Sequence, residues 1–196
     1  MEQRQFDQAM QLLINHHFKP WEGGQIIREI FVLANLEKGR QALETKNYAG
    51  AERAFRNALE YPVNLGVGKP DKPHDEEALY WLGATLAARG SASDAQEAWK
   101  TAVEEGKAAG GVPEVFAAGA LTKLGQVEEG EKLLAAASAA ANQPEASAYS
   151  LYGAGLAEQL RNHGSQAQKD FRRALELDPL LWEARFELTR SSGTGK

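Results

Sequence analysis

The amino-acid sequence predicts an all-α protein, a right-handed α-solenoid of about four helix pairs flanked by an N-terminal and a C-terminal helix. Two observations predict this fold class. Apolar side chains recur every three or four residues through most of the chain, as on one face of a helix. Small residues that could mark helix crossings recur at intervals of 44, 35 and 37 residues, which indicates an internal repeat. No segment has the pattern of a β-strand.

Residues 79–102 show one helix pair most clearly. Their first half carries leucines at positions i, i+3 and i+7, and Gly83 lies beside this apolar stripe. Gly90 is suited to end the first helix, and Ala95 and Trp99 lie one turn apart on the second. Because Gly83 and Ala95 are small, we expect the two helices to cross closely at these positions.

The remaining elements follow from the same periodicity and from glycine and proline as helix breakers. The first interval between small residues is about ten longer than the others, so a loop must be inserted there. In the last pair, Gly164 predicts a turn displaced by two residues relative to the other pairs. The predicted organisation is an N-terminal helix and loop at 1–24, repeats at about 25–62, 75–107, 111–141 and 146–179, an inserted loop at 61–74, a capping helix at 180–190 and a disordered tail at 191–196.

Two further predictions concern burial. Core spacing predicts that four large aromatic residues pack inside: Trp81, Trp99, Phe171 and Trp182. The last helix of a stack needs a solvated outer face. The polar residues expected to form that face are Glu183, Arg185, Glu187 and Arg190.

Composition excludes several function classes. The 196-residue chain has no cysteine, so it has no disulfide, thiolate metal site or cysteine nucleophile. Its net charge of −5 argues against non-specific binding to nucleic acid or to an anionic membrane. No apolar run approaches the ~18 residues of a membrane span, and the polar N-terminus is unlike a signal peptide. We therefore expect a cytoplasmic protein without a cofactor.

The spacing in residues 79–102 reproduces the W-x2-L-G-x2-Y…A-x3-F signature with conservative substitutions. The chain thus resembles the tetratricopeptide repeat family from about residue 33 to residue 179. The resemblance implies a non-catalytic protein–protein or interdomain scaffold, not an enzyme, whose first helices line a concave groove. The groove positions are Leu36, Arg40, Tyr80, Ala84, Ala88, Val115, Gly119 and Lys123. Of these, Arg40, Tyr80 and Lys123 are the predicted binding residues.

Two segments resemble a narrower group, the repeat region of large bacterial proteins that carry an N-terminal galactose-mutarotase-like β-sandwich. The matching residues are His16, Phe18, Pro20, Trp21, Glu22, Gly23 and Gly24, and Tyr61, Pro62, Asn64, Leu65, Gly66, Gly68 and Lys69. This resemblance implies an accessory module to a carbohydrate-active protein, with the two glycine-rich loops facing the companion domain. The contact residues that it implies are Trp21, Glu22, Asn64 and Lys69.

Alternative functions remain open. His16, His17 and Glu22 could bind a metal or act as acid and base. However, adjacent histidines rarely point the same way and no further ligand follows at helical spacing, so we expect no metal site and no catalytic residue. The alternative prediction is a carbohydrate-binding or hydrolytic protein that uses residues 16–24 and 64–69. A third is a homo-oligomerisation module.

Overall fold

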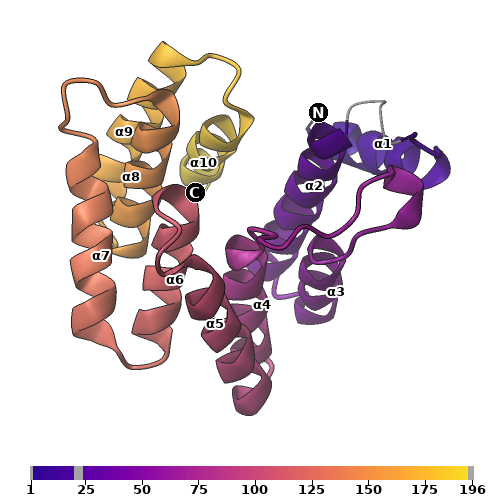
Figure 1. Ribbon diagram of the computed structural model, residues 1–196, viewed down its shortest axis with the longest axis horizontal. Coiled ribbons are helices and arrows are strands. Elements are labelled where there is room, and N and C mark those ends of the chain that lie inside the picture. The colour runs from indigo at the N-terminus through magenta and orange to yellow at the C-terminus, as the bar shows by residue number, and fades with distance from the viewer. Residues whose placement is uncertain (1, 20–23, 194–196) are drawn as a thin grey trace. The chain divides into compact units, whose positions relative to one another are not determined.

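The computed structural model describes residues 2–19 and 24–193, and every regular element in these ranges is helical (Figure 1). The predicted all-α class is confirmed. The elements are α1 Glu2–Asn15, α2 Gly24–Glu44, α3 Tyr48–Ala58, the 3-10 helix η1 Val63–Leu65, α4 Glu76–Ala88, α5 Ala92–Gly106, α6 Gly111–Lys123, α7 Val127–Ala140, α8 Ala148–Leu160, α9 Gly164–Leu177 and α10 Trp182–Gly193.

Helices that follow one another in sequence pack as neighbours. The chain divides into two compact units, residues 1–98 and 99–196. In the first unit, α2 packs against α1, α3 and α4. In the second, α6 packs on α7, α7 on α8, α8 on α9 and α9 on α10. None of the described helices is long and apolar enough to cross a membrane.

The turn inside each helix pair has the same form. Three residues separate the two helices, and the middle one has a positive φ angle. These middle residues are Lys46 (58°), Gly90 (87°), Gly125 (86°) and Asn162 (64°). The predicted displacement of the last turn is wrong, because Asn162 adopts the left-handed conformation that asparagine tolerates. Gly164 is therefore the first residue of α9 and does not form the turn.

In two of the helix pairs, a glycine of the first helix lies close to an aromatic ring of the second helix. A Cβ atom on Gly39 of α2 would lie 2.5 Å from the ring of Phe55 on α3. The equivalent atom on Gly155 of α8 would lie 2.4 Å from the ring of Phe171 on α9. Both phenylalanines are fully buried, so only glycine allows these helices to approach so closely.

Sixteen residues separate Gly39 from Phe55, and sixteen separate Gly155 from Phe171. The same interval recurs elsewhere in the chain. It separates Gly83 from Trp99, and it separates Ala118 of α6 from Leu134 of α7. Ala118 and Leu134 are both buried. Alanine is one methyl group larger than glycine, and leucine is smaller than the aromatic side chains at the matching position of the other pairs.

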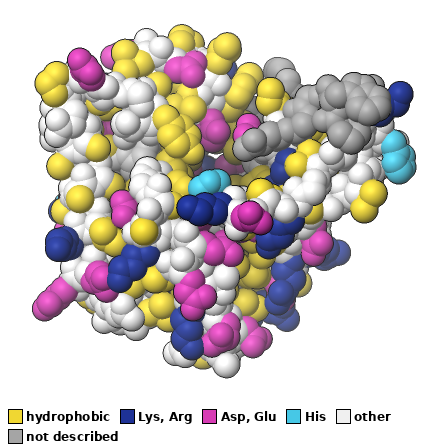
Figure 2. All heavy atoms as spheres, viewed as in Figure 1, with side chains coloured by type: hydrophobic (Ala, Val, Ile, Leu, Met, Phe, Trp, Pro, Cys, Tyr) yellow, Lys and Arg dark blue, Asp and Glu magenta, His cyan; other side chains and the backbone are white. Residues whose placement is uncertain are grey.

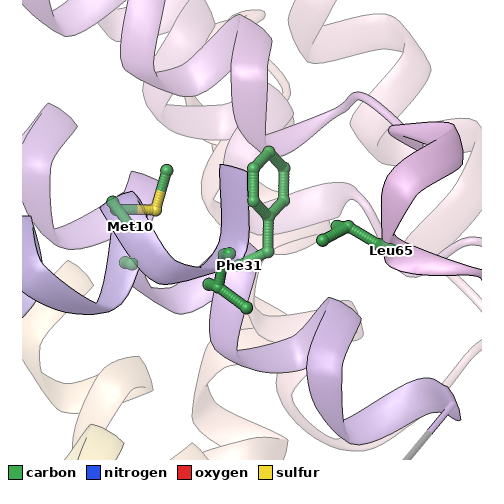
Figure 3. Close-up of a cluster of buried hydrophobic side chains, with 5 residues drawn as sticks. Met10, Phe31 and Leu65 are labelled. Atoms are coloured by element: carbon green, nitrogen blue, oxygen red, sulfur yellow. The ribbon is translucent and has the colours of Figure 1, made fainter. Parts of the chain in front are cut away.

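The inserted loop completes the core of the first unit. Leu65 of η1 lies in one buried cluster with residues from α1 and α2 (Figure 3). Gly66 follows with a φ of 69° and ends the η1 turn, and Phe18 packs against the cluster. The members of the cluster are Met10, Leu13, Phe31, Ala34 and Leu65.

The polarity predicted for the C-terminal helix is partly wrong. Glu187 of α10 is 1% exposed. It accepts a hydrogen bond from Gln159 at 3.0 Å and pairs with Arg190 at 2.6 Å. Because these two charges satisfy each other, they can lie on the inner side of the helix. Arg185, by contrast, is exposed as predicted.

The predicted burial of the four aromatic residues is confirmed for some of them and wrong for others. Trp99 and Phe171 are buried as predicted, whereas Trp81 is half-buried and Trp182 is 51% exposed. The core prediction is therefore wrong for Trp182, which is the first residue of α10.

The predicted disordered tail is also partly wrong. Residues 191–193 belong to α10, and residues 194–196 lie outside the described residues.

Candidate functional site

One face of α2 forms a continuous surface in the first unit. Ile26, Ile30, Leu33, Glu37 and Arg40 follow one another at intervals of four, three, four and three residues. This spacing places their side chains along one side of the helix. Ile26 and Ile30 are 62% and 43% exposed and Leu33 is half-buried, whereas Glu37 and Arg40 are buried. We call this surface the α2 stripe: it is apolar and open at its N-terminal end, and charged and closed at its C-terminal end.

The closed end of the α2 stripe contacts an aromatic group on α4. The guanidinium carbon of Arg40 lies 4.8 Å from the centre of the Trp81 ring, within the range of a cation–π interaction. A second contact joins Arg40 Nη1 to Glu77 Oε1 at 3.9 Å. The ring of Tyr80 meets that of Trp81 edge-on, with the ring centres 5.1 Å apart. The structure thus brings the predicted residues Arg40 and Tyr80 together through Trp81.

Tyr80 is better placed to make packing contacts than to transfer a proton. Burial raises the pKa of Tyr80 to about 12, although the nearby Arg40 acts in the opposite direction. The phenol therefore stays protonated at neutral pH and cannot serve as a base. The indole Nε1 of Trp81 is buried and has no hydrogen-bond partner among the described residues.

Asn64 holds the inserted loop to the end of α1. Its side-chain Nδ2 donates to the carbonyl oxygens of Leu13 at 2.7 Å and His16 at 3.0 Å, with a longer contact of 3.4 Å to that of Ile14. Its own carbonyl oxygen accepts a hydrogen bond from the Phe18 amide at 2.7 Å. Asn64 therefore satisfies carbonyl groups that a helix end leaves without partners.

Lys69 belongs to a second anchor of the same loop. Its Nζ lies 3.7 Å from Asp75 Oδ2 and 5.8 Å from the centre of the Tyr61 ring. Arg28 of α2 lies 4.2 Å from the centre of the same ring. It also donates to the Ala58 carbonyl at 2.8 Å and contacts Asp75 Oδ1 at 3.4 Å. The loop is therefore fastened by charges as well as by Leu65.

Two buried acids lie at this anchor. Asp75 and Glu76 are 6% and 2% exposed. Burial raises the pKa of both carboxyl groups, and for Asp75 the charges of Arg28 and Lys69 oppose that effect. Glu76 Oε1 lies 3.8 Å from Nδ1 of His74. We attribute the raised values to desolvation, since both side chains are almost completely removed from water.

The other predicted site residues are distributed as follows. Lys123 is exposed at the end of α6 in the second unit, and Trp21 and Glu22 lie outside the described residues. His16 packs edge-on against Phe18, with ring centres 4.5 Å apart. Among the other groove positions, Ala84 is half-buried and Ala88 exposed. Those that are buried are Leu36, Val115 and Gly119.

Sequence reasoning missed part of this surface. The interval pattern of the α2 stripe was present in the sequence and would have identified Ile26 and Ile30 as one face with Arg40. In contrast, Arg28 and Asp75 are 47 residues apart, and no local pattern connects them. Trp81 was assigned to the core because its spacing is that of a buried residue.

The described residues include no group of three or more histidine, aspartate or glutamate side chains that could hold a metal ion. In Figure 2, both basic and acidic side chains are seen on the surface. No protein-family model matches the chain, and the searches of curated proteins and of solved structures found no match.

Proposed function

We propose that this protein is a non-catalytic scaffold that binds a partner protein through the α2 stripe. The observation that carries the proposal is the exposure of Ile26 and Ile30 beside half-buried Leu33 on one helix face. Aliphatic side chains at these intervals form a ridge that packs against the apolar face of another helix. The partner segment is therefore an amphipathic helix.

The closed end of the stripe supports the same function. Trp81 is half-buried, so part of its ring is open to a partner, and Arg40 stacks on that ring. Tryptophan and arginine are enriched among the residues that contribute most to binding energy. Ile30 and Arg40 of α2 and Trp81 of α4 thus offer an apolar anchor and a polar boundary to a partner.

The repeat architecture and the companion domain are part of the proposal. The shared turn position and the sixteen-residue interval of the helix crossings support tetratricopeptide-type repeats, which would stack as a solenoid. The resemblance of residues 16–24 and 61–69 to repeat regions beside a galactose-mutarotase-like domain supports an accessory role to a carbohydrate-active protein. In the first unit, Asn64 and Lys69 act by fixing the loop.

The test begins with a photo-crosslinking amino acid at Ile30, which identifies the partner by mass spectrometry in extracts of the source cells. Binding of the purified partner is then measured by calorimetry. Ile26 and Ile30 are 62% and 43% exposed, so a partner could newly bury the equivalent of about one whole side chain. Burying one such side chain contributes about 1.5–3 kcal/mol, and each lost tenfold in binding corresponds to about 1.4 kcal/mol. The double variant Ile26→Glu/Ile30→Glu should therefore weaken binding about 10- to 100-fold.

The control variant is Val63→Glu, which adds an acid at a 92% exposed position that belongs to η1 and not to α2. It should bind as the wild type does. Unchanged binding by the double variant, with an unchanged circular dichroism spectrum, would remove the α2 stripe from the interface.

A further inference from the structure

We propose that residues 66–74, which we call the flap, close over the buried acids Asp75 and Glu76 and open when these acids lose their protons. The flap is the second half of the inserted loop and leads from η1 into α4. From α2, Arg28 contacts Asp75, and Arg28 is not part of the α2 stripe. The inference therefore does not rest on the proposed function.

The two halves of the inserted loop are held differently. In the first half, Leu65 is 2% exposed and the Asn64 side chain donates hydrogen bonds to the end of α1. In the flap, residues 68–72 are all exposed. No backbone hydrogen bond joins residues 67–74 to another of the described residues. A segment with few buried contacts and no backbone hydrogen bonds can open while its surroundings stay folded.

One ionic contact ties the flap back to its own end. Lys69 Nζ lies 3.7 Å from Asp75 Oδ2, and the Lys69 side chain is 57% exposed. An ion pair with one such exposed partner contributes little to stability, because water screens it. The charge of Lys69 therefore holds the flap less firmly than Leu65 and Asn64 hold the first half of the loop.

The flap lies between two turns with positive φ angles. Gly66 has a φ of 69° at its beginning, and His74 has a φ of 57° at its end. This left-handed region is uncommon for a residue other than glycine. The turn at His74 brings its Nδ1 to 3.8 Å from Glu76 Oε1. Rotation at the two turns would move the flap as one segment, as hinge residues do in other loops.

Both acids are surrounded by the flap and by neighbouring helices. Asp75 and Glu76 are 6% and 2% exposed. The charged groups that face them are Arg28 from α2 and Lys69 and His74 from the flap, and Glu76 also faces Asp75. From α3, the carbonyl group of the last residue accepts a hydrogen bond from Arg28 at 2.8 Å. The closed flap thus keeps two carboxyl groups away from water.

The protonation of these acids sets the direction of the response. Burial raises the pKa of both carboxyl groups, although the nearby cations act in the opposite direction. Opening hydrates the acids and returns each pKa toward its ordinary value, 3.8 for Asp75 and 4.5 for Glu76. Protonation therefore favours the closed flap. This preference is complete below the ordinary values and is lost as the pH rises through the raised ones.

Distances between two spin labels, measured by electron paramagnetic resonance from about pH 4 to pH 8, test the flap. Because the chain has no cysteine, Gly68→Cys and Arg53→Cys introduce the only two thiols. A Cβ atom at Gly68 would meet nothing within 4 Å, and Arg53 is exposed on α3. The matched control pair is Val63→Cys with Arg53→Cys, since Val63 is 92% exposed but belongs to η1.

The pair with Gly68→Cys should show one distance at low pH and a second distance that grows as the pH rises. The ratio of open to closed flap should increase by up to about tenfold per pH unit for each acid that ionises. The control pair with Val63→Cys should keep one distance throughout. A pH-independent distance for the Gly68→Cys pair would overturn the proposal.

Variants of the acids identify the groups that control the flap. Asp75→Asn/Glu76→Gln should keep the flap closed at every pH, whereas Asp71→Asn removes an exposed acid of the flap and should respond as the wild type does. If circular dichroism shows that the double variant does not fold, Glu76→Gln alone decides, and its response should fall to at most about tenfold per pH unit. A full response in the folded double variant, or in Glu76→Gln, would overturn the proposal.

Discussion

Replacing Gly155 with alanine tests whether close glycine–aromatic contact holds the helix pairs together. The added Cβ atom would lie 2.4 Å from Cε1 and 2.6 Å from Cδ1 of Phe171. The Phe171 side chain is fully buried, so its ring cannot move into solvent. Either the ring or the helix axis must shift by several tenths of an ångström, and a close-packed interior resists such shifts.

Two opposing effects set the magnitude. Alanine is favoured over glycine inside a helix by about 0.5–1 kcal/mol. Overpacking a core by one methyl group costs about 1–3 kcal/mol. Because the new methyl group overlaps more than one atom of the ring, the cost should lie in the upper part of that range. We expect Gly155→Ala to lower the free energy of unfolding by about 1–2 kcal/mol.

Gly153 provides a matched control in the same helix. Its added Cβ would lie 3.6 Å from Cγ2 of Val112, an ordinary contact distance. Gly153→Ala should therefore raise the free energy of unfolding by up to about 1 kcal/mol. Urea titrations followed by far-ultraviolet circular dichroism measure both changes from the midpoint and slope. If Gly155→Ala stabilised the protein as Gly153→Ala does, the close-contact explanation would be refuted.

A double variant tests the contact itself. Gly155→Ala/Phe171→Leu gives α8 and α9 the side chains that Ala118 and Leu134 provide in α6 and α7. Leucine should leave space for the new methyl group. The double variant should therefore be more stable than the sum of the two single changes predicts, by at least about 1 kcal/mol. Additive effects would show that Gly155 and Phe171 do not interact.

Two further predictions concern the inserted loop. Asn64→Ala removes the side-chain hydrogen bonds to the end of α1. It should lower the free energy of unfolding by about 1–2 kcal/mol and accelerate hydrogen exchange at residues 13–18. The control Val63→Ala, at a 92% exposed position, should change neither the stability nor the exchange. Burial raises the pKa of Glu76 above its ordinary value of 4.5, so its stabilising contribution is present below pH 4.5 and is lost as pH rises through the raised pKa. Glu76→Gln should therefore gain thermal stability relative to the wild type between pH 4 and pH 8. A constant difference in melting temperature across that range would contradict the assigned burial.

The sequence predicted those parts of the candidate surface that lie on one helix or on equivalent repeat positions. Arg40 and Tyr80 were predicted from groove positions, and the structure joins them through Trp81. Asn64 and Lys69 are predicted contacts to a companion domain, and the structure shows that both contact residues of this chain. These contacts within the chain could not be read from the sequence, because Asn64 and the Leu13 carbonyl that it caps are 51 residues apart.

By itself the sequence determined the helices and most of their turns, because helical periodicity and glycine at turns act over a few residues. The fourth turn was misplaced since Asn162 can adopt a conformation usually left to glycine. Only the tertiary structure decided which charges are buried. Glu187 and Arg190 are polar in sequence and lie on the inner side of α10 because they satisfy each other. Trp182 is apolar in sequence and exposed, because burial depends on which element packs against a side chain and not on the side chain alone.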